Sequence, residues 1–194
     1  MQTVQPIRDR AQLQEMAQFL RDWKERNFVM FMTGIGSAYR ITDMLSIQAG
    51  DIRERDFFIL TEGKTGKQRR MKMDPDLRKL LHEYIKGMPD DEYLFKSREG
   101  KNKPMSRTMA YLIIKKAAAA IGLKEQIGCH TMRKTFGYHH YQRFKDAVLL
   151  MQLFGHSRED ITLRYIGVTQ DMIDHSVDRL RMLKGIIPER KTVL

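Results

Sequence analysis

The sequence has a single cysteine and no long apolar segment. Because Cys129 stands alone among 194 residues, a disulfide within the chain is excluded and a reducing compartment suits the chain. No apolar run approaches the roughly 20 residues that a membrane-spanning helix needs, and the N-terminus lacks the apolar core of a signal peptide. We therefore expect a cytoplasmic protein with no membrane partner.

Motifs of cofactor and metal chemistry are also missing. The sequence has no Walker A loop, no dinucleotide-binding fingerprint and no cysteine or histidine spacing typical of zinc sites. Its acidic residues do not cluster as the two-metal site of a nuclease requires. We therefore expect chemistry that uses neither a cofactor nor a metal ion.

Positive charge, in contrast, is in clear excess. The chain carries 35 Lys and Arg against 24 Asp and Glu, a net charge of +11. Such an excess favours a polyanionic partner, because counterions released from phosphates drive binding, although a basic surface that binds nothing explains the charge equally well. The length suits one domain with a sizeable core, and no internal repeat or long linker divides it.

Hydrophobic periodicity predicts a mostly helical chain with one small antiparallel sheet, an α+β fold. Residues 28–36 form an apolar segment that we expect to be buried and to end in a glycine-containing bend. Between residues 56 and 73 the pattern changes to two short strands around a turn. The helices expected before residue 125 cover residues 11–23, 75–85 and 106–121, and a further helical pattern begins at Arg40.

The C-terminal third of the chain predicts three more helices. The first ends at Gly155. Ser157 is expected to cap the second, which carries Tyr165, and Thr169 is expected to cap the third. The apolar residues that make the third helix amphipathic are Met172, Ile173, Val177 and Leu180.

Residue types suited to phosphodiester chemistry recur along the chain. A guanidinium donates in a fixed fork that matches two phosphate oxygens, and Arg40 and Arg133 are candidates for such a clamp. Arg40 lies between apolar segments. A tyrosine, with a pKa near 10, needs a base and fixed positive charge to act as a nucleophile. Tyr165 follows His156 by nine residues. Each residue alone also has an ordinary explanation, such as a surface arginine or a half-buried tyrosine.

In their order and spacing these residues resemble the tyrosine recombinases, also called the phage integrase family, from about residue 10 to about residue 182. The segment GIGSAYRITDML (34–45) resembles the first arginine box, and EGKTGKQRRMKM (62–73) resembles the hairpin that carries the family's lysine. HTMR (130–133), FGH (154–156) and the later tyrosine resemble the remaining boxes. In the first box, Gly36, Ala38 and Tyr39 depart from the family pattern.

The resemblance implies a role for each matched residue. Arg40 and Arg133 would clamp the phosphate, and Tyr165 would be the nucleophile. His130 would manage the tyrosine proton as an acid/base group, and His156 would donate to a non-bridging oxygen. The mobile general acid for the 5′ oxygen would be Lys64, with Lys67 in the same turn as the alternative. We interpret Asp43 as a support that orients a cation.

The resemblance further implies the DNA breaking–rejoining enzyme fold and the activity of a site-specific recombinase. Such an enzyme cleaves and rejoins double-stranded DNA through a 3′-phosphotyrosyl intermediate without ATP or metal. It would act as a homotetramer on DNA, be a monomer when free, and come from a bacterium or phage. The alternatives are a non-catalytic DNA-binding regulator on the same scaffold and a type IB topoisomerase.

The position of the first arginine bears on domain organisation. Family members usually carry a helical core-binding domain before that arginine, and Arg40 comes too early for one. We expect residues 1–194 to form a single catalytic domain without a core-binding domain, as a natural minimal enzyme or a fragment. The segment from Thr169 onward would dock onto a neighbouring protomer, as is frequent in the family, or pack in cis.

Overall fold

The computed structural model describes residues 4–61, 66 and 68–184. Its two strands, β1 (Phe57–Thr61) and β2 (Gln68–Lys72), pair antiparallel, with Phe58 opposite Met71. The predicted α+β class is confirmed, and none of the described helices is long and apolar enough to cross a membrane. The helices are α1 (Arg10–Trp23), α2 (Glu25–Ile35), α3 (Ile41–Leu45), α4 (Ala49–Ile52), α5 (Pro75–Tyr84), α6 (Arg107–Ala120), α7 (Cys129–Phe144), α8 (Ala147–Phe154), α9 (Glu159–Tyr165) and α10 (Val168–Leu180).

Several helix ends follow from local side-chain chemistry. The side chain of Asp74 accepts from the first backbone N–H groups of α5, and Ser106 does the same for α6 through Met109 N. Such caps satisfy donors that have no partner inside the helix. Gly155 ends α8 in the left-handed region, with φ 65°, where a glycine has no steric cost. The expected ends at these positions are confirmed.

Two predicted caps near the C-terminus are wrong. Helix α9 begins after Arg158, whose backbone is extended and whose side chain pairs with Asp160 at 2.8 Å, so Ser157 lies outside the helix. Helix α10 begins after Gly167, which has φ 77°. Because a left-handed glycine turns the chain within one residue, α10 starts directly there and Thr169 already lies inside it. The expectation of a buried apolar segment over 28–36 that ends in a glycine-containing bend is confirmed, and the segment belongs to helix α2, which Gly36 caps.

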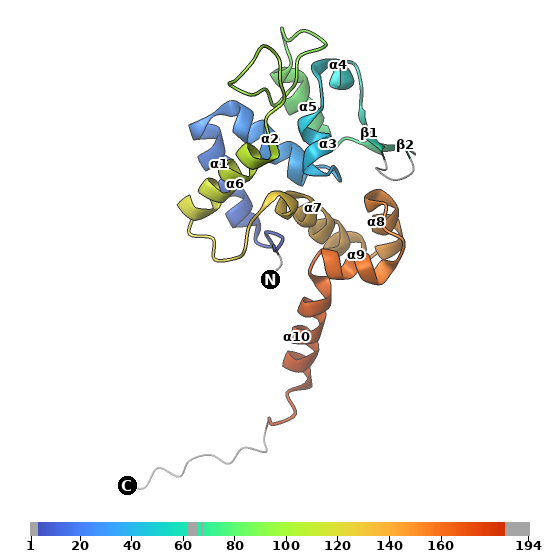
Figure 1. Cartoon of the computed structure of the whole chain (residues 1–194). Coiled ribbons are helices and arrows are strands. Elements are labelled where there is room, and N and C mark those ends of the chain that lie inside the picture. The colour runs from blue at the N-terminus through green and yellow to red at the C-terminus, as the bar shows by residue number, and fades with distance from the viewer. Residues whose placement is uncertain (1–3, 62–65, 67, 185–194) are drawn as a thin grey trace, which may run out of the picture.

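Helix α7 crosses the middle of the molecule and organises its packing (Figure 1). A β-carbon on Gly34 of α2 would lie 2.5 Å from the Met132 sulfur of α7. A β-carbon on Gly137 would lie 2.7 Å from both Phe154 and Ile166. The two glycines therefore let α2 approach one side of α7, and α8 and α9 approach the other. In contrast, α10 projects away from the body (Figure 1).

Candidate active site

Arg133 is built into the protein interior. Its side chain leaves α7 with only 6% of its surface exposed. The guanidinium donates to the carbonyl of Ala38 and, at 2.8 Å, to the carbonyl of Phe154. Burial lowers the pKa of Arg133 to about 10, so the group stays charged at neutral pH. Two backbone carbonyls and the Phe154 ring, 4.4 Å away, thus fix a buried cation in one orientation.

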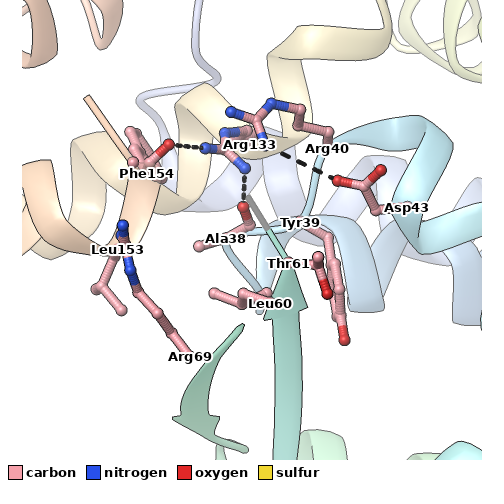
Figure 2. Close-up of a pocket in the computed structure, with 11 residues that line it drawn as sticks. Ala38, Tyr39, Arg40, Asp43, Leu60, Thr61, Arg69, Arg133, Leu153 and Phe154 are labelled. Carbon is pink, nitrogen blue, oxygen red and sulfur yellow. Dashed lines mark hydrogen bonds and ion pairs between the residues drawn. The ribbon is translucent and has the colours of Figure 1, made fainter. Parts of the chain in front are cut away.

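Arg40 lies beside Arg133 but is held more loosely. It precedes α3 with an extended backbone, and its side chain is 42% exposed. Its guanidinium is 4.0 Å from a carboxylate oxygen of Asp43, so the structure brings the proposed support next to this cation. Figure 2 shows both arginines lining one hollow, which also includes Tyr39 and Leu60. The two positive charges can therefore face a single bound anion.

Tyr165 and His130 meet across this site. The Tyr165 hydroxyl, at the end of α9, lies 3.3 Å from Nδ1 of His130, near the start of α7. Burial lowers the pKa of His130, and the nearby cations, led by Arg107, lower it further. The imidazole is therefore neutral at neutral pH and can accept a proton. A contact of this length is usual for a catalytic pair without bound substrate.

The environment of Tyr165 contains opposing influences. Burial raises the pKa of the phenol, while the charges of Arg133 and Arg40 act in the opposite direction. Two rings, Phe154 at 5.6 Å and His156 at 5.3 Å, surround the tyrosine ring edge-on. The phenol is thus protonated in the free protein, and a base must remove its proton before it can attack.

His156 is oriented by a residue that the sequence analysis did not identify. Its Nδ1 lies 3.0 Å from the hydroxyl of buried Thr162, one turn into α9. Burial, followed by the charges of Arg133 and Arg40, lowers the pKa of His156 to about 4. The sequence could have indicated Thr162 by its spacing. It lies three residues before Tyr165, and residues three apart share a side of a helix.

The predicted hairpin lysines, Lys64 and Lys67, lie outside the described residues. The described part of the hairpin supplies another cation, Arg69 of β2, whose side chain lines the hollow near Leu153 (Figure 2). Arg69 stands opposite Leu60 in the strand register. Side chains opposite one another share a face of the sheet. The alternation along the predicted strands could therefore have indicated that Arg69 points to the same side as the apolar Leu60.

Of the four histidines that match no family box (His82, His139, His140 and His175), which we expect to be structural or solvated, two contact backbone carbonyls. His82 contacts the carbonyl of Arg55 at 3.0 Å, and His139 contacts that of Ile7 at 3.0 Å. Within the described residues, no group of three or more His, Cys, Asp or Glu side chains could hold a metal ion. In and beside the hollow, the described residues place three guanidinium groups, two imidazoles and one phenol.

The sequence is similar to that of known proteins. Residues 8–172 match the model of the phage integrase family. The probable integrase/recombinase YoeC of Bacillus subtilis (strain 168) is 47% identical over 171 residues, covering 88% of this chain and 93% of YoeC.

Two solved structures share the fold. The crystal structure of XerA recombinase has a TM-score of 0.70 at 16% identity, covering 91% of this chain and 65% of that chain. The XerH site-specific recombinase, in a post-cleavage complex with palindromic difH substrate, has a TM-score of 0.67 at 16% identity, covering 90% of this chain and 53% of that one. This chain thus spans nearly all of YoeC but about half of XerH.

Proposed function

Because the chain belongs to the phage integrase family, we propose that it is a site-specific recombinase acting on double-stranded DNA. It would cleave and rejoin strands through a 3′-phosphotyrosyl intermediate, using neither ATP nor a metal ion. The observation that carries this proposal is the 3.3 Å contact between the Tyr165 hydroxyl and His130, beside the two arginines. The DNA complex of XerH supports DNA as the substrate.

Cleavage would begin with a scissile phosphate in the hollow between Arg40 and Arg133. Their guanidinium groups would hold its non-bridging oxygens and stabilise the additional negative charge of the transition state. The Tyr165 oxygen would attack phosphorus in line and pass its proton to Nδ1 of His130. The bond from phosphorus to the 5′ oxygen would break, and that oxygen would take a proton from Lys64, which lies outside the described residues.

Rejoining would reverse these steps. A 5′ hydroxyl from a partner strand would attack the phosphotyrosine and pass its proton back to Lys64. The bond between phosphorus and the Tyr165 oxygen would break, and His130 would return the proton to the phenol. The energy of the phosphodiester is kept in the protein–DNA bond throughout, so no nucleotide triphosphate is needed.

His156 would serve as a donor to a non-bridging oxygen once the phosphate is present. In the free protein its pKa is lowered to about 4, and Nδ1 faces the Thr162 hydroxyl. A bound phosphate brings negative charge and favours the protonated ring. The ring would then donate from Nδ1 to Thr162 and from Nε2 to the phosphate.

The proposal extends to domain organisation and assembly. Residues 1–194 would form one catalytic domain, monomeric when free because a net charge of +11 disfavours self-association. On DNA four copies would assemble for two successive strand exchanges. The exposed apolar side chains of α10 support assembly, since Met172, Ile173, Val177 and Leu180 are each more than half exposed. A helix packed in cis would have buried them.

The test is covalent trapping on DNA. The protein is incubated with fragments of its source genome, adducts that survive denaturation are sequenced, and a nicked substrate is built from the enriched site. The parent should form a 3′ adduct on that substrate. Tyr165→Phe should bind with similar affinity and form none.

Other outcomes identify the alternatives. An adduct formed by Tyr165→Phe would show that the nucleophile is another residue. Specific binding without any adduct would favour a non-catalytic regulator, and relaxation of supercoiled plasmid without site preference would favour a topoisomerase.

A further inference from the structure

The residues before α1 form an extended strap, residues 4–8, that lies along α7. The backbone N–H of Ile7 donates to the Thr135 hydroxyl at 2.9 Å, and His139 contacts the Ile7 carbonyl at 3.0 Å. Lys134 donates to the Val4 carbonyl at 2.8 Å. Ile7 itself is 1% exposed. The strap is therefore anchored to α7 by backbone hydrogen bonds as well as by a buried side chain.

The last residue of the strap reaches across the chain to α10. Arg8 donates from Nε to one oxygen of Asp171 at 3.1 Å, and its NH2 lies 3.1 Å from the other oxygen. The two side chains are each 30% exposed, and the Arg8 guanidinium lies 5.3 Å from the Tyr138 ring. A two-pronged, partly buried pair fixes both distance and direction, so Arg8 holds the first turns of α10 against α7.

The strap also packs against the joint between α9 and α10. This joint is Gly167, two residues after Tyr165, with φ 77°. A β-carbon there would meet Arg8 at 2.9 Å, Gln5 at 3.4 Å and Pro6 at 3.6 Å. The strap therefore encloses the residue at which the chain turns immediately after the tyrosine.

A buried lysine connects the strap to the tyrosine ring. Lys134 follows Arg133 in α7 and is 4% exposed. The ammonium that donates to Val4 lies 5.0 Å from the centre of the Tyr165 ring. Strap, lysine and tyrosine thus form one contiguous set of contacts.

Little else holds α10 to the body. Val168 is its only buried residue, and its remaining described side chains are exposed or half-exposed. Figure 1 shows the helix leaving the body beyond α9. The direction of α10 therefore depends on the Gly167 joint and on Asp171, which pairs with Arg8 and also interacts with Tyr138 of α7.

From these contacts we propose that Arg8 is a positioning residue for the nucleophile. The strap holds the Gly167 joint, and thereby keeps Tyr165 within reach of His130 and fixes the direction in which α10 leaves the domain. The kinetic half of this inference rests on the proposed function, whereas the direction of α10 does not. Displacing residues 4–8 would release the tyrosine helix and α10 together, without touching the arginine site.

The test compares Arg8→Ala with Arg10→Ala, which removes the same charge two residues along the chain from an exposed position. Adduct formation is timed on saturating nicked substrate, and DNA affinity is measured separately. Arg8→Ala should slow adduct formation about tenfold, the scale of a small misplacement of a reacting group. Its affinity should match that of Arg10→Ala. Asp171→Ala should slow adduct formation at least as much, because it also removes the hydrogen bond between Asp171 and Tyr138. The double variant should be no slower than Asp171→Ala alone.

A second measurement requires no activity. Spin labels on cysteines introduced at Ser176 of α10 and Glu83 of α5, in a Cys129→Ala background, report the distance between the two helices. Arg8→Ala should broaden the distance distribution, and Arg10→Ala should leave it as in the parent. Equal distributions or equal adduct rates for the two variants would overturn the proposal. If the parent forms no adduct, the recombinase assignment fails, while the label distances still decide whether Arg8 directs α10.

Should Arg8→Ala fail to fold, Arg8→Lys keeps the charge but loses the two-pronged geometry. It should show a smaller change in both measurements, and parental values in both would argue against a positioning role.

Discussion

The arginine side and the tyrosine side of the site differ in how firmly they are held. Arg133 is buried and donates to two backbone carbonyls, from Ala38 and Phe154. Tyr165 ends a helix of seven residues that is followed by a single-residue joint and by α10, in which only Val168 is buried. The arginine side is therefore part of the core, whereas the tyrosine side continues into a helix that has little contact with the core.

This difference suits a reaction in which the protein must be both rigid and adjustable. Stabilising a transition state requires charges that do not reorganise when the phosphate arrives. A nucleophile that attacks, stays bonded to DNA and later leaves benefits from a helix that can shift slightly. Elements with few buried contacts open most readily. In α10, directly after the tyrosine helix, only Val168 is buried, whereas Thr162 of α9 is fully buried.

The largest effect should come from removing each arginine in turn. Changing either Arg40 or Arg133 to Ala should slow cleavage by about two to three orders of magnitude. Arg133→Ala should also lower the free energy of unfolding by about 1–3 kcal/mol, because it leaves two buried carbonyls without a donor. Arg40→Ala, at a half-exposed position, should leave the free energy of unfolding nearly unchanged.

The measurements are adduct kinetics and urea unfolding, with Arg78→Ala on the exposed face of α5 as the control for lost charge. Equal destabilisation by the two active-site variants would remove the contrast between a core cation and a surface one. Equal losses in DNA binding and cleavage would count against the clamp role.

The next effect concerns the contact by which α7 holds the tyrosine side. Gly137→Ala would bring a methyl group within 2.7 Å of Phe154 and Ile166, and it should destabilise the protein by about 1–3 kcal/mol. Gly34→Ala meets Met132 instead, 2.5 Å from its sulfur and 3.0 Å from its β-carbon. The thioether end can move away, so only the β-carbon contact requires a small shift of the helix. Gly34→Ala should therefore cost less in urea unfolding. A larger cost at Gly34 would mean that the α2–α7 contact is the less adaptable one.

Much of this architecture was predictable from local patterns. Helix ends could be recognised from residue types that cap or end helices, namely Asp74, Ser106 and Gly155. The change from helical to strand periodicity indicated the hairpin. The family boxes brought Arg40, His130 and Tyr165 to attention, and the structure places these residues together.

What the sequence could not show depends on contacts between distant segments. Arg8 and Asp171 are separated by 163 positions, and each alone resembles a solvated charge. Thr162 is close in sequence, six positions after His156, and its spacing to Tyr165 indicates its side of the helix, but only the structure shows its hydroxyl beside the imidazole. The caps of α9 and α10 were misassigned by one or two residues because an extended Arg158 and a left-handed Gly167, rather than a serine or threonine side chain, set the helix starts.

His156 should couple acidity to both stability and DNA binding. Its pKa is about 4 in the folded protein against 6.5 for an ordinary histidine. Between these pH values the unfolded chain binds a proton that the folded chain does not. The free energy of unfolding should therefore fall as pH falls from about 6.5 to about 4. His156→Gln should reduce this dependence in urea unfolding at several pH values.

Bound DNA should raise the pKa of His156, because the negative charge of a phosphate favours the protonated imidazole. Binding near pH 6 should take up protons, which calorimetry in buffers of different ionisation enthalpy detects, and His156→Gln should diminish the uptake. Uptake that is identical in the two proteins would assign it to another group.

The smallest expected effect on stability lies on α10. Val177 and Leu180 are 64% and 69% exposed, so the double change to Ser removes almost no buried apolar surface. The free energy of unfolding should stay within about 0.5 kcal/mol of the parent, as is usual for exposed positions. Leu150→Ser in α8 is the matched contrast, because Leu150 is fully buried and its loss should cost several-fold more. If the α10 variant binds DNA as a single copy like the parent but loses cooperativity, its apolar face serves assembly. A destabilisation comparable to that of Leu150→Ser would instead show that α10 packs against its own domain in solution, and the two sides of the site would then be equally firm.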